Sequence, residues 1–440
     1  MSRLSQLNAS VLQRTVGSMR QTWARDRVLI ALMGQVFLTM LGISIVGPVM
    51  PLYASSFGVS AAMVGSLVTA FGLARIVMNI PAGGLCERLG RKPLLVAGPL
   101  ITSLAALLTG LAGEFNQLIL WRFVQGLGSS LQTTTAMTVL ADISTRETRG
   151  RSMSLYQGSL LLGSSFGPTL GGFVAQAWGY RAVFFVYSVL ALLAAIWAFN
   201  AVRETKGCSP ADTSPTDRSV STTEVQTSPN TRNSVLALLS DLGFLLVSAV
   251  TLTVFFTRSG GRSTVLPLFG SQRLGLTPGQ LGFTFTFISI WNLITLNWSG
   301  TLSDKLGRKA VIVPGCLLSG FSLLVFSLSG NYALFLIGAA LMGLGTGLAG
   351  PAPAAYVADL SKAGRHGLTM GMYRTFGDIG VSVGPILLGW LSDQLGYAFA
   401  LRTNGLMFII TGLAFGLFAR ETVKRSMGTQ PSEARHDRRT

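Results

Sequence analysis

Long apolar stretches alternate with short polar turns along almost the whole chain. A helix that crosses a bilayer needs roughly 20 mostly apolar residues. Twelve stretches reach about that length, at 28–54, 61–85, 93–112, 116–141, 153–177, 180–202, 242–269, 278–302, 310–330, 332–358, 368–394 and 397–419. Since a soluble fold has no use for so many such runs, the pattern predicts an all-α membrane protein with twelve transmembrane helices.

One polar segment divides the twelve predicted helices into six and six. Residues 203–241 are rich in Ser, Thr and Pro, a composition typical of a disordered linker. The predicted organisation is a tail at 1–27, a six-helix bundle at 28–202, the linker at 203–241, a second bundle at 242–419 and a tail at 420–440.

The two predicted bundles are copies of one another. The decapeptide GGLCERLGRK at 83–92 returns as GTLSDKLGRK at 300–309, an offset of 217 positions. The same offset aligns Gly167-Pro168 with Gly384-Pro385 and Arg203-Glu204-Thr205 with Arg420-Glu421-Thr422. An even number of helices per copy keeps both copies in one orientation, so the sequence predicts two parallel six-helix repeats.

The distribution of charged residues predicts how the chain is oriented in the membrane. Only 12% of the residues are charged, against about 25% in a soluble protein. The net charge of +17 could indicate nucleic-acid binding. With the N-terminus in the cytoplasm, however, 26 of the 34 Lys and Arg residues fall on the cytoplasmic side. This is the positive-inside rule, and it predicts both termini in the cytoplasm, a plasma (inner) membrane location and no nucleic-acid partner.

Other compositional signals are weaker. The Arg-rich segment 1–27 is typical of either a cytoplasmic tail or a mitochondrial-type transit peptide. Three cysteines and two histidines form no metal or disulfide pattern. Since the chain also has no nucleotide-binding loop and no nucleophile–base pair, we expect no enzymatic activity, no cofactor and no metal.

Three signatures carry a resemblance to the major facilitator superfamily, over roughly 28–422. The first is the repeated loop signature: Gly83, Glu87, Arg88, Gly90, Arg91 and Lys92, then Gly300, Asp304, Lys305, Gly307, Arg308 and Lys309. The second is Arg122 with Gln125 and Gly126 in helix 4. The third is the helix-5 signature: Gly163, Gly167, Pro168, Gly171 and Gly172. The resemblance implies the major facilitator fold, and the third signature implies the twelve-helix drug:proton antiporter group and export.

The repeated loops suggest a cytoplasmic gate. Glu87 and Asp304 can accept hydrogen bonds from helix-end N–H groups or from nearby Arg, and such bonds would latch this side in one state and break in the other. The alternative is a plain basic turn that only sets topology.

Charged side chains inside the predicted spans indicate function, because each is costly in lipid. Asp378 is the one carboxylate well inside, and Arg374 lies four residues before it on the same helix face. We expect Asp378 to carry protons with Arg374 as its partner, or else the two to form a fixed structural ion pair. Arg75, Arg122, Arg258, Arg262 and Gln125 are candidates for the substrate cavity. Arg75 and Arg122 could instead have structural partners, such as backbone carbonyls or acids at helix ends.

The excess of arginine predicts the substrate. Five Arg against one Asp make the central cavity positive, which disfavours a lipophilic cation and favours an anionic or neutral amphipathic compound. Arg258 and Arg262 share one face of helix 7, where they repel each other unless an anion or an acid lies between them. They could also only brace the helix. Gln35, Trp291, Asn292 and Tyr373 are further cavity candidates, with interhelical packing as the alternative.

These observations combine into one functional prediction. We expect a monomeric secondary transporter that alternates access between two rocking halves and exports small organic molecules by proton antiport. Organic-anion uptake or exchange is the first alternative. A membrane receptor or scaffold without transport is the second.

Overall fold

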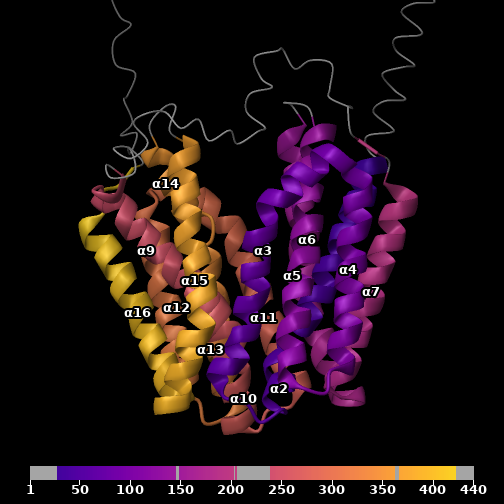
Figure 1. Ribbon diagram of the computed structural model, residues 1–440. Coiled ribbons are helices and arrows are strands. Elements are labelled where there is room, and N and C mark those ends of the chain that lie inside the picture. The colour runs from indigo at the N-terminus through magenta and orange to yellow at the C-terminus, as the bar shows by residue number, and fades with distance from the viewer. Residues whose placement is uncertain (1–26, 145–147, 203, 206–237, 362–365, 423–440) are drawn as a thin grey trace, which may run out of the picture.

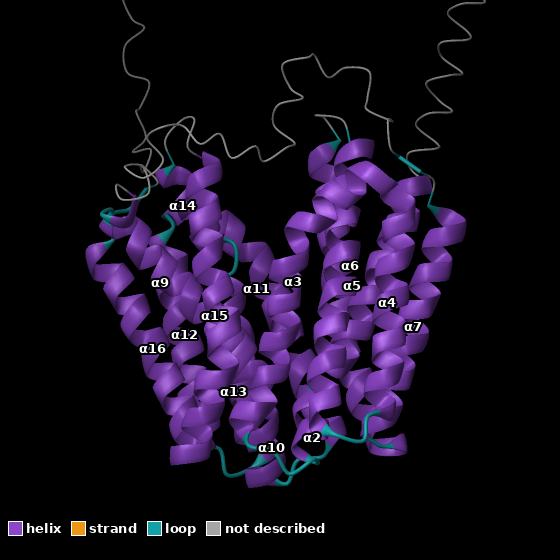
Figure 2. Ribbon diagram, in the orientation of Figure 1, coloured by secondary structure: helices purple, strands orange, loops and turns teal. Residues whose placement is uncertain are grey.

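The computed structural model describes residues 27–144, 148–202, 204–205, 238–361 and 366–422 (Figure 1). Most of both predicted tails and most of the predicted linker lie outside these residues. The described chain is helical and contains no strand, and its helices form two groups that stand side by side (Figure 2). The predicted all-α membrane fold is therefore confirmed.

The N-terminal group holds six helices. They are a first helix Arg27–Ser55 with α2 (Met50–Ser55) as its last part, α3 (Ala61–Leu89), α4 (Arg91–Leu111), α5 (Phe115–Ile143), α6 (Arg149–Trp178) and α7 (Tyr180–Ala201). The first helix is interrupted at 47–49, next to Pro48, which supplies no backbone N–H.

The C-terminal group holds the other six. They are α9 (Leu242–Phe256) continuing through a π-helical segment, η2 (Thr257–Val265), into α10 (Leu266–Leu274); α11 (Pro278–Leu306); α12 (Lys309–Leu328); α13 (Tyr332–Ala349) with α14 (Ala352–Leu360); α15 (His366–Leu395); and α16 (Tyr397–Phe418). A break at Gly350–Pro351, which the sequence pattern did not predict, separates α13 from α14.

Ten of the helices are long and apolar enough to cross a membrane. The other two, α5 and α6, have 29 and 30 residues and are long enough as well. They are less apolar because their buried faces carry polar side chains, such as Gln125, Ser129 and Gln132 in α5. These two helices and the ten complete the predicted twelve.

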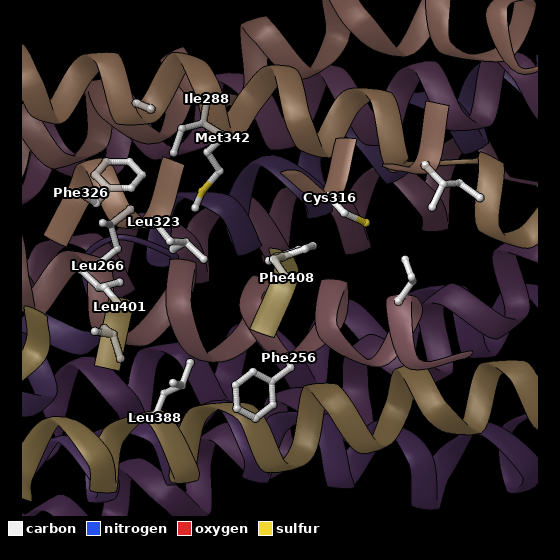
Figure 3. Packing of buried hydrophobic residues seen from close by; sticks show 14 of the residues in the cluster. Phe256, Leu266, Ile288, Cys316, Leu323, Phe326, Met342, Leu388, Leu401 and Phe408 are labelled. Atoms are coloured by element: carbon white, nitrogen blue, oxygen red, sulfur yellow. The ribbon is translucent and has the colours of Figure 1, made fainter. Parts of the chain in front are cut away.

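Each group has its own apolar core. In the C-terminal group, Phe256, Leu323, Phe326 and Phe408 lie in one buried cluster that joins α9, α12 and α16 (Figure 3). Between the groups, α3 lies beside α15 and α6 beside α11. α14 lies at one end, here called the linker end, and α2 and α10 lie at the other, here called the far end (Figure 1).

Candidate functional site

A cavity of about 470 Å³ lies between the two groups. The N-terminal group lines it with small or apolar residues: Ile43, Ser44, Gly47, Pro48, Leu161, Ser164, Ser165 and Pro168. The C-terminal group supplies two cations, several amide or hydroxyl side chains and most of the large apolar residues. They include Arg258, Arg262, Thr251, Thr257, Ser263, Ser289, Asn292, Thr346, Tyr373, Phe255, Phe285, Met342 and Phe408. No lining residue is acidic.

The two cations of the cavity stand on the π-helical segment η2. The Arg262 guanidinium lies over the Phe285 ring at 5.4 Å from its centroid, and its Nη2 donates to Ser289 Oγ at 3.3 Å. The Arg258 side chain is exposed to the cavity, and its guanidinium makes no hydrogen bond or ion pair with the described residues. Since no acid lies between the two, an unpaired guanidinium is left for a ligand.

Asp378 and Arg374 lie on α15 but do not form the expected pair. Both side chains are exposed, no ion pair joins them, and neither lines the cavity. The Asp378 carboxylate lies within electrostatic range of Arg374 and also of Arg75 in α3, across the two groups. The structure therefore adds Arg75 to the surroundings of Asp378.

Four of the nine predicted cavity residues line the cavity: Arg258, Arg262, Asn292 and Tyr373. Asn292 Nδ2 donates to Thr346 Oγ1 at 3.0 Å, which holds its amide at the wall. The other five do not line this cavity, and their assignment to a substrate cavity stays a prediction. They are Arg75, Arg122, Gln125, Gln35 and Trp291.

Three of those five, Arg122, Gln125 and Gln35, make hydrogen bonds inside their own half. Arg122 Nη1 donates to Gln125 Oε1 at 2.9 Å and its guanidinium stacks on Phe71. Gln35 is fully buried and donates to Leu95 O at 2.7 Å. Sequence spacing cannot separate a side chain that faces the cavity from one that faces its own bundle.

Matching charged clusters sit at the linker end of both halves. Glu204 accepts from the backbone N–H groups of Arg91 and Lys92, at 2.9 and 3.1 Å. Glu421 accepts from those of Arg308 and Lys309, at 2.9 and 3.0 Å. These carboxylates cap α4 and α12, where free N–H groups attract negative charge.

A carboxylate on the neighbouring helix completes each cluster. Arg91 Nε lies 2.9 Å from Asp142 Oδ2, and Arg308 Nε lies 3.1 Å from Asp359 Oδ2. Burial lowers the pKa of Arg308, but its bonds to Asp359 and Asp304 raise this pKa by more, so the guanidinium stays charged.

The repeated loop glycines have a local reason. Gly90 and Gly307 adopt φ values of 95° and 104°, a region that favours glycine. A Cβ at Gly90 would also meet Glu204 Oε2 at 2.6 Å. Gly83 and Gly300, by contrast, have open space around them.

The predicted latch residues act within one half here. Asp304 binds Arg308, four residues away, and the Glu87 side chain is exposed. Their role in another state stays a prediction. The capping carboxylates Glu204 and Glu421 were missed, although the repeat of Arg-Glu-Thr at the offset of 217 was the signal for them.

Glycines close the far end. A Cβ at Gly65 would meet the Pro385 carbonyl of the other half, and one at Gly172 would meet that of Pro278. The residues that match these pairs at the offset of 217 make equivalent contacts. A Cβ at Gly282 would meet the carbonyl of Pro168, and one at Gly389 would meet that of Ala61. The four glycines, here called the far-end glycines, therefore allow backbone to touch backbone between the halves.

Part of the helix-5 signature contributes to the contact between the halves at the far end. Gly163, Gly167 and Gly171 pack on the backbone of the first helix, at Phe37, Leu41 and Ile45. Gly172 and Pro168 face α11. The signature thus joins α6 to two helices at once.

One carboxylate accepts hydrogen bonds from the other half at the far end. Asp393 of α15 accepts from Ala61 N at 2.7 Å and from Ala62 N at 2.9 Å, the first residues of α3. Further hydrogen bonds between the halves lie farther in. Thr69 Oγ1 donates to Ser382 O, Thr169 Oγ1 bonds to Thr286 Oγ1 and Gly282 O, and Thr286 Oγ1 donates to Ser165 O.

A bundle of twelve membrane-length helices in two matching halves, with a polar cavity between them, defines a membrane transporter. A family model described as Major Facilitator Superfamily matches residues 32–295 and 251–439. The chain belongs to this superfamily. It is a multi-pass integral membrane protein that moves small molecules and is not an enzyme.

Two relatives and one solved structure show the extent of the similarity. The chain is 29% identical to "Multidrug resistance protein 2" of Bacillus subtilis, over 83% of this chain and 89% of the relative. It is 22% identical to "Quinolone resistance protein NorA" of Staphylococcus aureus, over 81% and 88%. A bacterial homolog of the human lysosomal transporter Spinster, in an inward-facing and occupied conformation, superposes with a TM-score of 0.72 at 17% identity, over 89% and 96%.

Proposed function

We propose that this transporter exports amphipathic organic anions in exchange for protons. The observation that carries the proposal is the Arg258 guanidinium, which faces the cavity with no hydrogen bond or ion pair to the described residues. A guanidinium binds carboxylate, sulfonate or phosphate groups through paired hydrogen bonds. The low-dielectric walls of the cavity strengthen its attraction for an anion.

The rest of the wall suits the apolar part of such a compound. Phe255, Phe285, Met342 and Phe408 offer aromatic and thioether surface on the C-terminal side, and Ile43 and Leu161 face them from the N-terminal side. Pockets of this kind bury the apolar body of a ligand and orient it through a few polar contacts. An amphipathic anion satisfies both parts of the lining.

Asp378 is the proposed proton carrier. It is the one carboxylate in the middle of a predicted span, and its neighbours Arg374 and Arg75 belong to different halves. Motion of the halves would change the distance between Arg75 and Asp378, and so the affinity of the carboxylate for a proton. The alternative, a fixed structural role, predicts transport that is independent of this carboxylate.

Direction and location rest on two observations. The helix-5 signature and the names of the two relatives, which concern multidrug and quinolone resistance, support export. The distribution of Lys and Arg supports a cytoplasmic linker end in the plasma (inner) membrane. The far end, closed here by the far-end glycines, would then face outward. We propose that the monomer is the working unit.

A matched pair of probes tests the substrate class. Anilinonaphthalenesulfonate is anionic, and N-phenylnaphthylamine has the same aromatic framework without the sulfonate. We expect purified protein in proteoliposomes to transport the anionic probe. Arg258→Gln should raise the KM for the anionic probe roughly 5- to 150-fold, which corresponds to a loss of about 1–3 kcal/mol of binding free energy. It should leave binding of the neutral probe unchanged. Arg258→Lys should rescue in part.

The control is Arg402→Gln, which removes an arginine whose Nε donates to Ser327 rather than facing the cavity. A normal KM with reduced folded protein in Arg258→Gln would show a bracing role and defeat the proposal. Uptake or exchange of the anion without proton coupling would favour the first alternative. Absence of any flux would favour a receptor.

A further inference from the structure

The helix formed by α9, η2 and α10 has an unusual backbone. Between α9 and α10 the chain is π-helical over nine residues, Thr257–Val265. π-helical turns are rare, are mostly limited to a single turn, and occur frequently at functional sites. Side-chain and interhelical contacts must therefore stabilise this π-helical segment.

Hydroxyl groups inside the segment match its spacing. Ser263 Oγ donates to Arg258 O at 2.9 Å, and Thr264 Oγ1 donates to Ser259 O at 3.0 Å. Each bond spans five residues, as the backbone bonds of a π-helix do. Gly260 lies against the Gly384 backbone of α15 with no room for a side chain.

A buried amide from α16 holds both sides of the segment. Thr257 Oγ1 donates to Asn404 Oδ1 at 2.7 Å, and both residues are buried. Asn404 Nδ2 lies against Gly261, where a Cβ would not fit, and has no acceptor. One side chain thus contacts the first residue of the π-helix and the residue one turn later.

The N-terminal half supplies a natural comparison. At the offset of 217, Tyr187 stands where Asn404 does, and it packs on Gly42. The first helix is α-helical there, and its residues matching Arg258 and Arg262 are Leu41 and Ile45. The amide, the π-helical turn and the two cations therefore occur together in one half and are absent together from the other.

We infer that Thr257 and Asn404 are positioning residues for anion recognition: their hydrogen bond holds the π-helical turn that presents Arg258 to the cavity. Return to α-helix would take one residue out of the turn and rotate one flank against the other by about 100°. Arg258 would then leave the cavity wall. This inference rests on the proposed binding of an anion by Arg258.

Thr257→Val tests the inference because it removes the hydroxyl and keeps the shape. Binding of anilinonaphthalenesulfonate to the purified full chain is measured beside that of N-phenylnaphthylamine. We expect Thr257→Val to weaken the anionic probe about 3- to 10-fold, the effect of one net hydrogen bond, and to leave the neutral probe unchanged. Asn404→Leu should act in the same direction, and Thr257→Ser should restore the affinity.

Thr253→Val is the matched control. Thr253 lies one turn earlier in α9, is equally buried, and bonds only to Ala249 O of its own helix. Normal anion affinity in Thr257→Val, together with lost affinity in Arg258→Gln, would overturn the inference and leave the proposed function intact. Normal affinity in both variants would overturn the proposed function. Equal loss of both probes in Thr257→Val would show a purely structural role and overturn the inference.

Discussion

The internal repeat is preserved at the linker end and lost at the charged positions of the membrane interior. At the linker end, Glu204 and Glu421 cap matching helices, each beside a matching Arg–Asp pair. Inside the bundle the same offset matches Arg258 with Leu41 and Asp378 with Leu161. The repeat is copied where both halves need the same joint, and it has diverged where charges can meet a ligand.

This contrast separates mechanics from chemistry. Two halves that rock about a common site need equivalent joints at their ends, because both must accept the same change of angle. A substrate that is not symmetric needs its charge recognised on one side only. The cationic side of the cavity is accordingly supplied by the C-terminal half, and the N-terminal half offers small and apolar surface.

The largest expected effect comes from removing the carboxylate of Asp378, the one acid in the middle of a predicted span. Asp378→Asn should abolish proton-driven uphill transport, because the amide cannot take up and release a proton, and leave facilitated exchange partly intact. Accumulation of the anionic probe against its gradient in proteoliposomes measures the first, and counterflow measures the second. The control is Glu114→Gln, which removes a carboxylate at the start of α5 that makes no capping bond and should keep uphill transport. Undiminished accumulation in Asp378→Asn would remove this residue from coupling.

A symmetric pair of substitutions at the far end should have the next largest effect. Gly65→Ala and Gly282→Ala each place a methyl group against a carbonyl of the other half. Overpacking costs about 1–3 kcal/mol, so each substitution should increase the population of the state with an open far end by roughly 5- to 150-fold.

The reactivity of a thiol introduced at Thr69, in a cysteine-free background, reports this shift. Gly330→Ala is the control, because Gly330 has open space around it. Unequal effects of Gly65→Ala and Gly282→Ala would show that the two sides of the closure are not mechanically equivalent.

Smaller and equal effects are expected from the linker-end caps. Glu204→Gln and Glu421→Gln weaken two charge-assisted hydrogen bonds each at exposed positions. Each should lower the Tm of the purified protein by roughly 2–5 °C, about 1 kcal/mol for a helical half of this size. Glu114→Gln is the control, since its side chain makes no capping bond. A loss in one half only would contradict the equivalence of the two clusters.

The smallest effect should come from Asp393→Asn. The amide still accepts from α3 but lacks the charge that strengthens such bonds, so the far end should open about 2- to 5-fold more readily. Asp241→Asn is matched to it, because Asp241 caps α9 within its own half and should leave the opening unchanged. Equal thiol reactivity in wild type and Asp393→Asn would show that the glycine contacts alone hold this end.

The sequence predicted what depends on composition and repetition. The length of the apolar runs gave the helices, and the copied decapeptide gave the paired halves. It could not predict the π-helical segment, because the partner of Thr257 is 147 residues away on α16. It also could not separate Arg258 from Arg122, since the choice between cavity and bundle depends on helix rotation. Asn292 and Tyr373 were identified as cavity residues, whereas Gln35 faces its own bundle.

The far-end glycines also bear on the entropy of opening and closing. A contact made by long side chains immobilises rotamers when it forms, and that loss of freedom opposes closure more strongly as temperature rises. Glycine has no rotamers to lose, and backbone held in a helix is already ordered. Closing this end therefore changes the conformational entropy of the protein very little. The balance between the two open states should vary only weakly with temperature, so that binding of a proton or a substrate, rather than heat, decides which side opens.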